Sequence, residues 1–142
     1  MTLTVFCFGC GKSGGESGGI EWGADMDAAL KEAKETDRIV MVDFMATWCP
    51  PCRAMEDSTF CRPEVIEKAK MFVTVRIDVD EQKDGAVKYG GNARKYGGIG
   101  IPNILFMTSG EEKIKHIVGY HGPDNLIMVM DSVLARSTAD EE

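Results

Sequence analysis

Two spacings of hydrophobic residues alternate along the chain and predict where strands and helices form. The stretch 38–46 is an almost unbroken apolar run with β-branched residues, which is typical of a buried strand. Apolar and polar residues alternate over 72–79 and predict a second strand. Two further strands, 103–107 and 113–118, surround a turn at Ser109-Gly110, which is the pattern of a β-hairpin.

Helical spacing fills the intervals between these strands. Apolar residues fall on one stripe over 25–37, and helices are also predicted over 50–60, 63–70 and 123–135. The polar, glycine-rich stretch 80–100 predicts a short helix broken by glycines. Because helices separate the early strands, these strands should pair in parallel through crossovers, with the hairpin as an antiparallel edge. The predicted fold class is therefore α/β, a central mixed β-sheet flanked by helices on both faces.

Length and composition are those of one globular domain, with 142 residues, 44% of them hydrophobic and 27% charged. Residues 1–21 are predicted to form a flexible N-terminal segment with a Gly/Ser-rich tether, residues 22–137 the domain, and residues 138–142 a frayed tail. The net charge of −7 argues against nucleic acid or an anionic membrane surface as a partner. The acidic cluster within 78–84 is interpreted as a solvated face. No apolar run approaches the roughly 18 residues that cross a bilayer.

The five cysteines direct attention to sulfur chemistry. Four of them form two Cys-x-x-Cys pairs, Cys7/Cys10 and Cys49/Cys52, and the fifth is Cys61. Cys49 and Cys52 occupy the junction between a buried strand and a helix, where they can close a small disulfide ring. Unpaired N–H groups and the positive end of the helix dipole beside Cys49 would stabilise its thiolate. Cys49 is therefore the predicted nucleophile, and Cys52, one turn further in and more buried, the predicted resolving cysteine.

The segment VDFMATWCPPCRAM resembles the active-site segment of the thioredoxin superfamily. The likeness continues at Ile101-Pro102, where that family carries a cis-proline, and at Gly119 after the last strand, and it covers residues 24–136. Within the superfamily, the sequence is most similar to thiol:disulfide interchange proteins such as the C-terminal domain of DsbD and the TlpA-like reductases. The resemblance implies the thioredoxin fold and a thiol:disulfide oxidoreductase activity.

Several residue roles follow from this resemblance. Cys49 and Cys52 match the redox pair. Asp43 matches the buried carboxylate behind the second cysteine, and a pKa raised by burial would suit it to accept the Cys52 proton. The backbone beside the cis-proline pairs with the substrate chain in an extended contact. The residues assigned to substrate binding are Trp48, Pro50, Pro51, Ile101 and Pro102.

The chain departs from the family pattern in three places. Pro50-Pro51 replaces the usual Gly-Pro between the cysteines, which leaves the reduction potential open. The lysine that faces the buried carboxylate in many thioredoxins falls near Thr74, so Asp43 has no assured charge partner. The segment before Pro102 is longer than in thioredoxin and is expected to form a rim of its own.

Cys7 and Cys10 admit three interpretations. They could complete a zinc site with Cys49 and Cys52, form a peripheral disulfide or second redox relay, or belong to a lipoprotein signal in which Cys10 carries the lipid. The third interpretation is favoured, because an apolar stretch precedes Cys10 and a Gly/Ser tether follows it. Cys61 is expected to be a buried, inert thiol. No metal, flavin or nucleotide motif is visible, so no metal or other cofactor is predicted.

These inferences predict a protein-disulfide reductase of the cell envelope, in the periplasm or lipid-anchored to the membrane. Its partners would be protein disulfide substrates and an upstream thiol donor, either a membrane reductase or a thioredoxin-type protein, and it would act as a monomer. One alternative is a cytoplasmic thioredoxin recycled by a flavoprotein reductase. Another is a non-catalytic, thioredoxin-like binding module.

Overall fold

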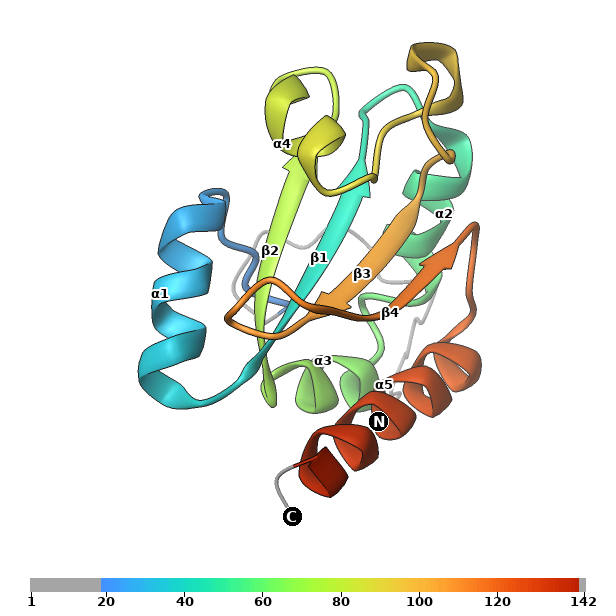
Figure 1. Ribbon diagram of the computed structural model, residues 1–142. Coiled ribbons are helices and arrows are strands. Elements are labelled where there is room, and N and C mark those ends of the chain that lie inside the picture. The colour runs from blue at the N-terminus through green and yellow to red at the C-terminus, as the bar shows by residue number, and fades with distance from the viewer. Residues whose placement is uncertain (1–18, 141–142) are drawn as a thin grey trace, which may run out of the picture.

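The computed structural model describes residues 19–140, and its helices and strands follow the hydrophobic pattern in order along the chain (Figure 1). The strands are β1 (Ile39–Met45), β2 (Phe72–Asp78), β3 (Asn103–Met107) and β4 (Lys113–Val118). The helices are α1 (Met26–Thr36), α2 (Pro50–Ser58), α3 (Pro63–Ala69), α4 (Lys83–Lys88), the 3-10 helix η1 (Arg94–Tyr96) and α5 (Pro123–Asp140).

The four strands form one mixed sheet in the order β2-β1-β3-β4. β1 and β2 run parallel, and β3 is antiparallel to both β1 and β4. The predicted crossover pairing and the predicted hairpin are both confirmed. In the parallel pair, Asp43 of β1 stands opposite Arg76 of β2. Because neighbours in register lie on the same face of a sheet, these two side chains share one face.

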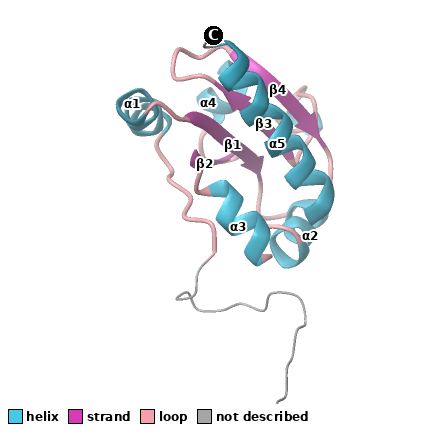
Figure 2. Cartoon of the chain, turned by 90° about the horizontal axis from the view of Figure 1, so that it is seen from below, coloured by secondary structure: helices cyan, strands magenta, loops and turns pink. Residues whose placement is uncertain are grey.

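Helices cover both faces of the sheet, as the sequence predicts. Figure 2 shows α1 on one side and α2, α3 and α5 on the other. One core cluster joins α1 and α4 to even-numbered residues of β1 such as Val40 and Phe44. The second joins α2, α3 and α5 to odd-numbered residues such as Met41. Side chains alternate between the faces along a strand, so a strand buried on both faces needs the almost unbroken apolar run seen in β1.

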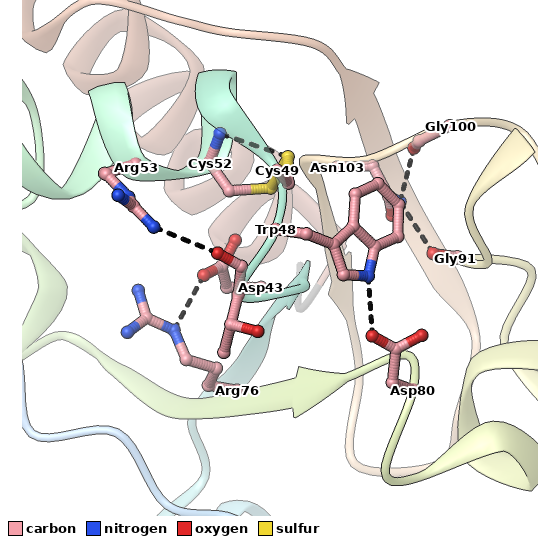
Figure 3. Close-up of a disulfide and its surroundings, with 11 residues drawn as sticks. Asp43, Trp48, Cys49, Cys52, Arg53, Arg76, Asp80, Gly91, Gly100 and Asn103 are labelled. Atoms are coloured by element: carbon pink, nitrogen blue, oxygen red, sulfur yellow. Dashed lines mark hydrogen bonds and ion pairs between the residues drawn. A yellow bond between two sulfur atoms is a disulfide. The ribbon is translucent and has the colours of Figure 1, made fainter.

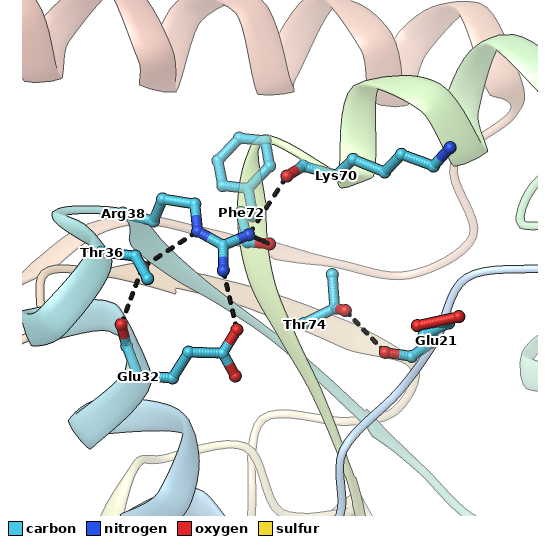
Figure 4. A network of polar contacts seen from close by, with 7 residues as sticks. All are labelled: Glu21, Glu32, Thr36, Arg38, Lys70, Phe72 and Thr74. Carbon is cyan, nitrogen blue, oxygen red and sulfur yellow. Dashed lines mark hydrogen bonds and ion pairs between the residues drawn. The ribbon is translucent and has the colours of Figure 1, made fainter.

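Arg38 connects α1, α3 and β2 through its side-chain contacts (Figure 4). Its guanidinium donates to the backbone carbonyls of Lys70 and Phe72, each at 3.2 Å. It also forms an ion pair with Glu32 at 2.7 Å, and its Nε donates to the Thr36 hydroxyl oxygen at 3.0 Å. The residue directly before β1 therefore ties the end of α1 to the start of β2, at the end of the sheet remote from the Cys49/Cys52 junction.

Asn103 fixes the loop that leads to Pro102, whose preceding peptide bond is cis. The Asn103 amide nitrogen donates to the carbonyls of Gly91 and Gly100, each at 2.9 Å. Its oxygen is paired with Nε2 of His116 at 2.7 Å, and since the amide hydrogens are already used, the His116 nitrogen must be the donor. One buried amide therefore joins both ends of the long loop to β3 and β4.

The C-terminal helix is longer than predicted. α5 continues to Asp140, past the expected end near residue 135, so the tail expected to be frayed from residue 138 begins inside the helix. Residues 136–140 contain neither glycine nor proline, so the sequence has no residue there that stops a helix. Over residues 19–140, none of the helices combines the length and the apolar character that a membrane crossing requires.

Replacing Asn103 with alanine should lower the free energy of unfolding by about 2 to 4 kcal/mol, because two buried carbonyls lose their donor. Asn125→Ala is the matched control, since Asn125 is exposed on α5 and its replacement should change stability little. Urea denaturation followed by circular dichroism measures both variants. If Asn103→Ala were as stable as the control, the amide would not be what holds the loop.

Candidate active site

Cys49 and Cys52 form a disulfide at the junction of β1 and α2, shown from close by in Figure 3. Cys49 is the N-cap residue of α2: its backbone is extended, and its sulfur accepts a hydrogen bond from the Cys52 N–H at 3.2 Å. Pro50 and Pro51 occupy the first helical positions, where an N–H would have no partner within the helix. The local sequence thus brings the two sulfurs together within one helical turn, with Cα atoms 5.2 Å apart.

Both cysteines are almost fully buried, with 3% of Cys49 and 6% of Cys52 exposed. The expectation that Cys52 would be the more buried of the two is wrong for this disulfide form. In the disulfide form the Cys49 sulfur lies against the first turn of α2, where it accepts from the Cys52 N–H and is bonded to the Cys52 sulfur. Trp48, Pro50 and Pro51 are exposed and form the accessible border of the disulfide.

The N-terminus of α2 can stabilise negative charge on Cys49. In the reduced protein, the Cys52 N–H that contacts the Cys49 sulfur would donate to a thiolate. The positive end of the helix dipole lies at the same place and acts in the same direction. Both effects lower the pKa of a thiol in the cap position, so the geometry favours Cys49 as the attacking sulfur.

Asp43 is buried in β1, with 1% of the residue exposed. One carboxylate oxygen accepts a hydrogen bond from Nε of Arg76 at 2.9 Å, and the other has no hydrogen-bond partner among residues 19–140. Burial raises the pKa of Asp43 from 3.8 to about 6, against the opposing effect of the Arg76 charge. A carboxyl group with a pKa near neutrality can both take up and release a proton, as a general base must.

Arg76 is the positively charged partner of Asp43, and the sequence analysis did not identify it. The lysine position of many thioredoxins falls near Thr74, whereas the parallel register places Arg76 opposite Asp43. The same guanidinium forms an ion pair with Glu56 on α2 and lies 4.6 Å from the centre of the Trp22 ring. Two carboxylates and a stacked ring hold the planar guanidinium in one orientation. Asp43 therefore has a fixed positive charge beside it.

Trp48 is an exposed aromatic residue that Asp80 holds in place (Figure 3). The Tyr96 hydroxyl donates to one Asp80 oxygen at 2.5 Å, and the Trp48 indole N–H donates to the other at 2.6 Å. These two hydrogen bonds lower the pKa of Asp80. Asp80 therefore holds Trp48 and Tyr96 together, a role that its interpretation as part of a solvated acidic face did not include. Trp48 and Tyr96 are distant from Asp80 in the sequence, so no local pattern could predict these two contacts.

Ile101 and Pro102 lie in the loop directly before β3. Ile101 is half-buried and packs against the core cluster that contains both cysteines. Pro102 is buried, and its carbonyl accepts a hydrogen bond from the Gly119 N–H at 2.8 Å. The residues predicted to bind substrate thus come from two separate elements. On the α2 side, an open hollow of about 380 Å³ is lined by Trp48, Pro50, Arg53, Ala54 and Asp57.

Of the other three cysteines, only Cys61 falls within the described residues. The predicted lipid anchor at Cys10, and the alternatives considered for Cys7, concern residues outside the described part of the chain. Cys61 lies in the turn between α2 and α3 and is half-buried, whereas the sequence predicts a buried residue. Its sulfur is also not the free thiol that was expected. Over residues 19–140, no group of three or more His, Cys, Asp or Glu side chains could hold a metal ion.

Comparison with known protein sequences identifies relatives of two kinds. A family model described as Thioredoxin-like matches residues 21–109. A thioredoxin H-type from Oryza sativa subsp. indica is 38% identical over 103 residues, which cover 70% of this chain and 73% of that protein. The thiol:disulfide interchange protein DsbD of Campylobacter jejuni is 29% identical over 99 residues, which cover 69% of this chain and 17% of that longer protein.

Solved structures of the same two kinds of protein are also similar to this chain. Thioredoxin NaTrxh from Nicotiana alata matches with a TM-score of 0.62 and 26% identity, over 84% of this chain and 97% of that one. The oxidised C-terminal domain of DsbD from Neisseria meningitidis matches with a TM-score of 0.61 and 25% identity, over 79% and 98%. The fold and the cysteine pair define a thiol:disulfide oxidoreductase with the thioredoxin fold. The chain belongs to the thioredoxin-like family.

The Asp43 carboxyl should make folding stability depend on pH. Its pKa is about 6 in the folded chain against an ordinary value of 3.8, so the folded state binds this proton more tightly than the unfolded state. The resulting stabilisation is complete below about pH 4 and is lost as the pH rises through about 6. Between those limits, the disulfide form should lose roughly 3 kcal/mol of unfolding free energy relative to Asp43→Asn.

Denaturant titrations of wild type and Asp43→Asn at a series of pH values measure this difference. Asparagine keeps an oxygen that can accept from Arg76, so the comparison isolates the titrating proton. A difference between the two proteins that stays constant from about pH 4 to about pH 8 would contradict the raised pKa of Asp43.

Proposed function

We propose that this chain is a protein-disulfide reductase in which the Cys49–Cys52 dithiol passes electrons to the disulfides of client proteins. The observation that carries the proposal is the disulfide closed across the N-terminus of α2. Two further features support it. The cis bond before Pro102 follows Ile101, which packs against the core cluster that contains both cysteines, and Asp43 supplies an ionisable group in the interior.

In the first step, the Cys49 thiolate attacks one sulfur of a client disulfide. A bond forms between Cys49 and that sulfur as the client S–S bond breaks, and the other client sulfur leaves as a thiolate that takes up a proton. An extended client segment paired with the backbone beside Pro102 would hold its disulfide in line with Cys49. The Cys52 N–H stabilises the attacking thiolate.

In the second step, the Asp43 carboxylate accepts the proton of the Cys52 thiol, and the resulting thiolate attacks the Cys49 sulfur. The mixed disulfide breaks, the Cys49–Cys52 bond forms, and the second client sulfur leaves and is protonated. The client has then gained two electrons and two protons. With a pKa near 6, Asp43 is mostly ionised at neutral pH and ready to accept the proton.

An upstream dithiol must reduce the Cys49–Cys52 disulfide before the next cycle. We assign this role to a membrane reductase or a thioredoxin-type protein, whose own thiols become a disulfide in the exchange. The proposed cycle draws its electrons from thiols alone and therefore uses no further cofactor. The clients are proteins that contain accessible disulfides, and the reductase acts as a monomer.

We place the activity in the cell envelope, in the periplasm or attached to the membrane through a lipid on Cys10. The similarity to DsbD supports this location, as do the apolar stretch and the Gly/Ser tether on either side of Cys10. The second candidate is a cytoplasmic thioredoxin recycled by a flavoprotein reductase. The 38% identity to a thioredoxin H-type favours that candidate.

Cysteine variants test the reaction. Cys49→Ser should abolish reduction of insulin disulfides with dithiothreitol as the donor, because the attacking sulfur is gone. Cys52→Ser should allow the first step and block the second, so that mixed disulfides with insulin accumulate on non-reducing gels. Cys61→Ser is the matched control and should keep the wild-type rate. Turnover retained by Cys49→Ser would contradict the proposal, and inactive wild type would favour a non-catalytic binding module.

Characterisation of the protein from its native cells tests the location. The envelope proposal expects the protein in the membrane or periplasmic fraction, with the mass of a lipid on Cys10. Peptide mass spectrometry after fractionation measures both. Recovery in the cytoplasm with an unmodified Cys10, together with rapid turnover by a flavoprotein thioredoxin reductase, would overturn the envelope location and support the second candidate.

A further inference from the structure

Positively charged side chains lie near Trp48 and Tyr96, on the border of the disulfide. The Lys95 ammonium lies 4.1 Å from the centre of the Trp48 ring and 5.2 Å from that of Tyr96. The Lys83 ammonium lies 5.9 Å from the centre of the Tyr96 ring. On the α2 side, Arg53 lines the same hollow as Trp48. We call this group the Trp48 rim, made of Trp48, Arg53, Lys83, Lys95 and Tyr96.

The cations of the Trp48 rim outnumber the carboxylates of Asp57 and Asp80 beside them. Over residues 19–140, no ion pair involves Arg53, Lys83 or Lys95. The Asp80 carboxylate accepts hydrogen bonds from Trp48 and Tyr96, and its negative charge also interacts with Lys95 and Lys83. Asp57 is the acidic residue that shares the hollow with Arg53. Three exposed cations therefore lie beside two carboxylates at the border of the disulfide, where a client must approach.

This local charge is opposite in sign to that of the chain as a whole, which has 23 acidic and 16 basic residues. Most of the surface would therefore repel an acidic segment, while the Trp48 rim would attract it. We propose that the Trp48 rim selects clients that carry an aspartate or glutamate next to the disulfide to be reduced. The inference rests on the proposed disulfide reduction and adds the chemistry by which clients are chosen.

Lys95 is the residue on which this selection depends most. It lies over Trp48, which directly precedes Cys49, so an anion bound to the outer side of its ammonium lies close to the reacting sulfur. The indole face attracts the ammonium and restricts its position, and Asp80 in turn fixes the indole. Complementary charge placed this way raises the association rate of matching partners and disfavours like-charged ones.

Two disulfide peptides that differ only in their flanking charges test the proposal. One carries two glutamates beside its cystine and the other two lysines, and each is mixed with pre-reduced protein in a single-turnover experiment at low salt. Wild type should reduce the acidic peptide faster, and Lys95→Glu should lower the acidic-to-basic rate ratio about fivefold or more. Lys95→Arg should restore it, and added salt should shrink the preference.

Lys115→Glu is the matched control, because it makes the same charge change at an exposed position on β4 outside the rim. Its rate ratio should stay close to that of wild type. Equal rates for both peptides with wild type, or the same loss of preference in Lys115→Glu as in Lys95→Glu, would overturn the rim as a selective surface. Failure of the proposed function is distinguishable, since wild type would then reduce neither peptide.

Discussion

The junction between β1 and α2 sets the geometry on which the active site depends. The buried strand ends at Met45 and the helix begins at Pro50, so the first N–H groups of the helix need a partner from the residue that caps them. Cys49 fills that position, and its sulfur accepts from the Cys52 N–H while also bonded to the Cys52 sulfur. The Cys52 N–H, which needs a partner at the start of α2, is therefore also the group that would stabilise a Cys49 thiolate for exchange.

The buried carboxylate of Asp43 lies in β1 shortly before this junction, and Arg76 compensates its charge only in part. An isolated carboxylate in the interior would be protonated at neutral pH, and a fully satisfied one would hold its charge at any physiological pH. Asp43 lies between these limits, because Arg76 pairs with one oxygen while the other has no hydrogen-bond partner among residues 19–140. The resulting pKa near 6 suits Asp43 to the proton transfer from Cys52 that we propose.

The sequence predicted those features that depend on neighbouring residues. The order of strands and helices follows from apolar spacing, and the redox pair follows from two cysteines at a strand-to-helix boundary. Arg76 and Asp80 were missed because their partners lie 33 and 32 residues away. Only the parallel register of β1 and β2 places Arg76 opposite Asp43. Asn103 was missed likewise, since nothing local shows that its amide reaches Gly91. Contacts across the sheet, not local pattern, determine these positions.

The central claim is that the two thiols are unequal, with Cys49 the attacking sulfur because it caps α2. Alkylation of the reduced protein by limiting iodoacetamide at neutral pH tests this most directly, since only thiolates react at an appreciable rate. Peptide mass spectrometry then measures the label on each cysteine. The account predicts that Cys49 is labelled first and Cys52 only slowly. Equal labelling of the two, or faster labelling of Cys52, would contradict it.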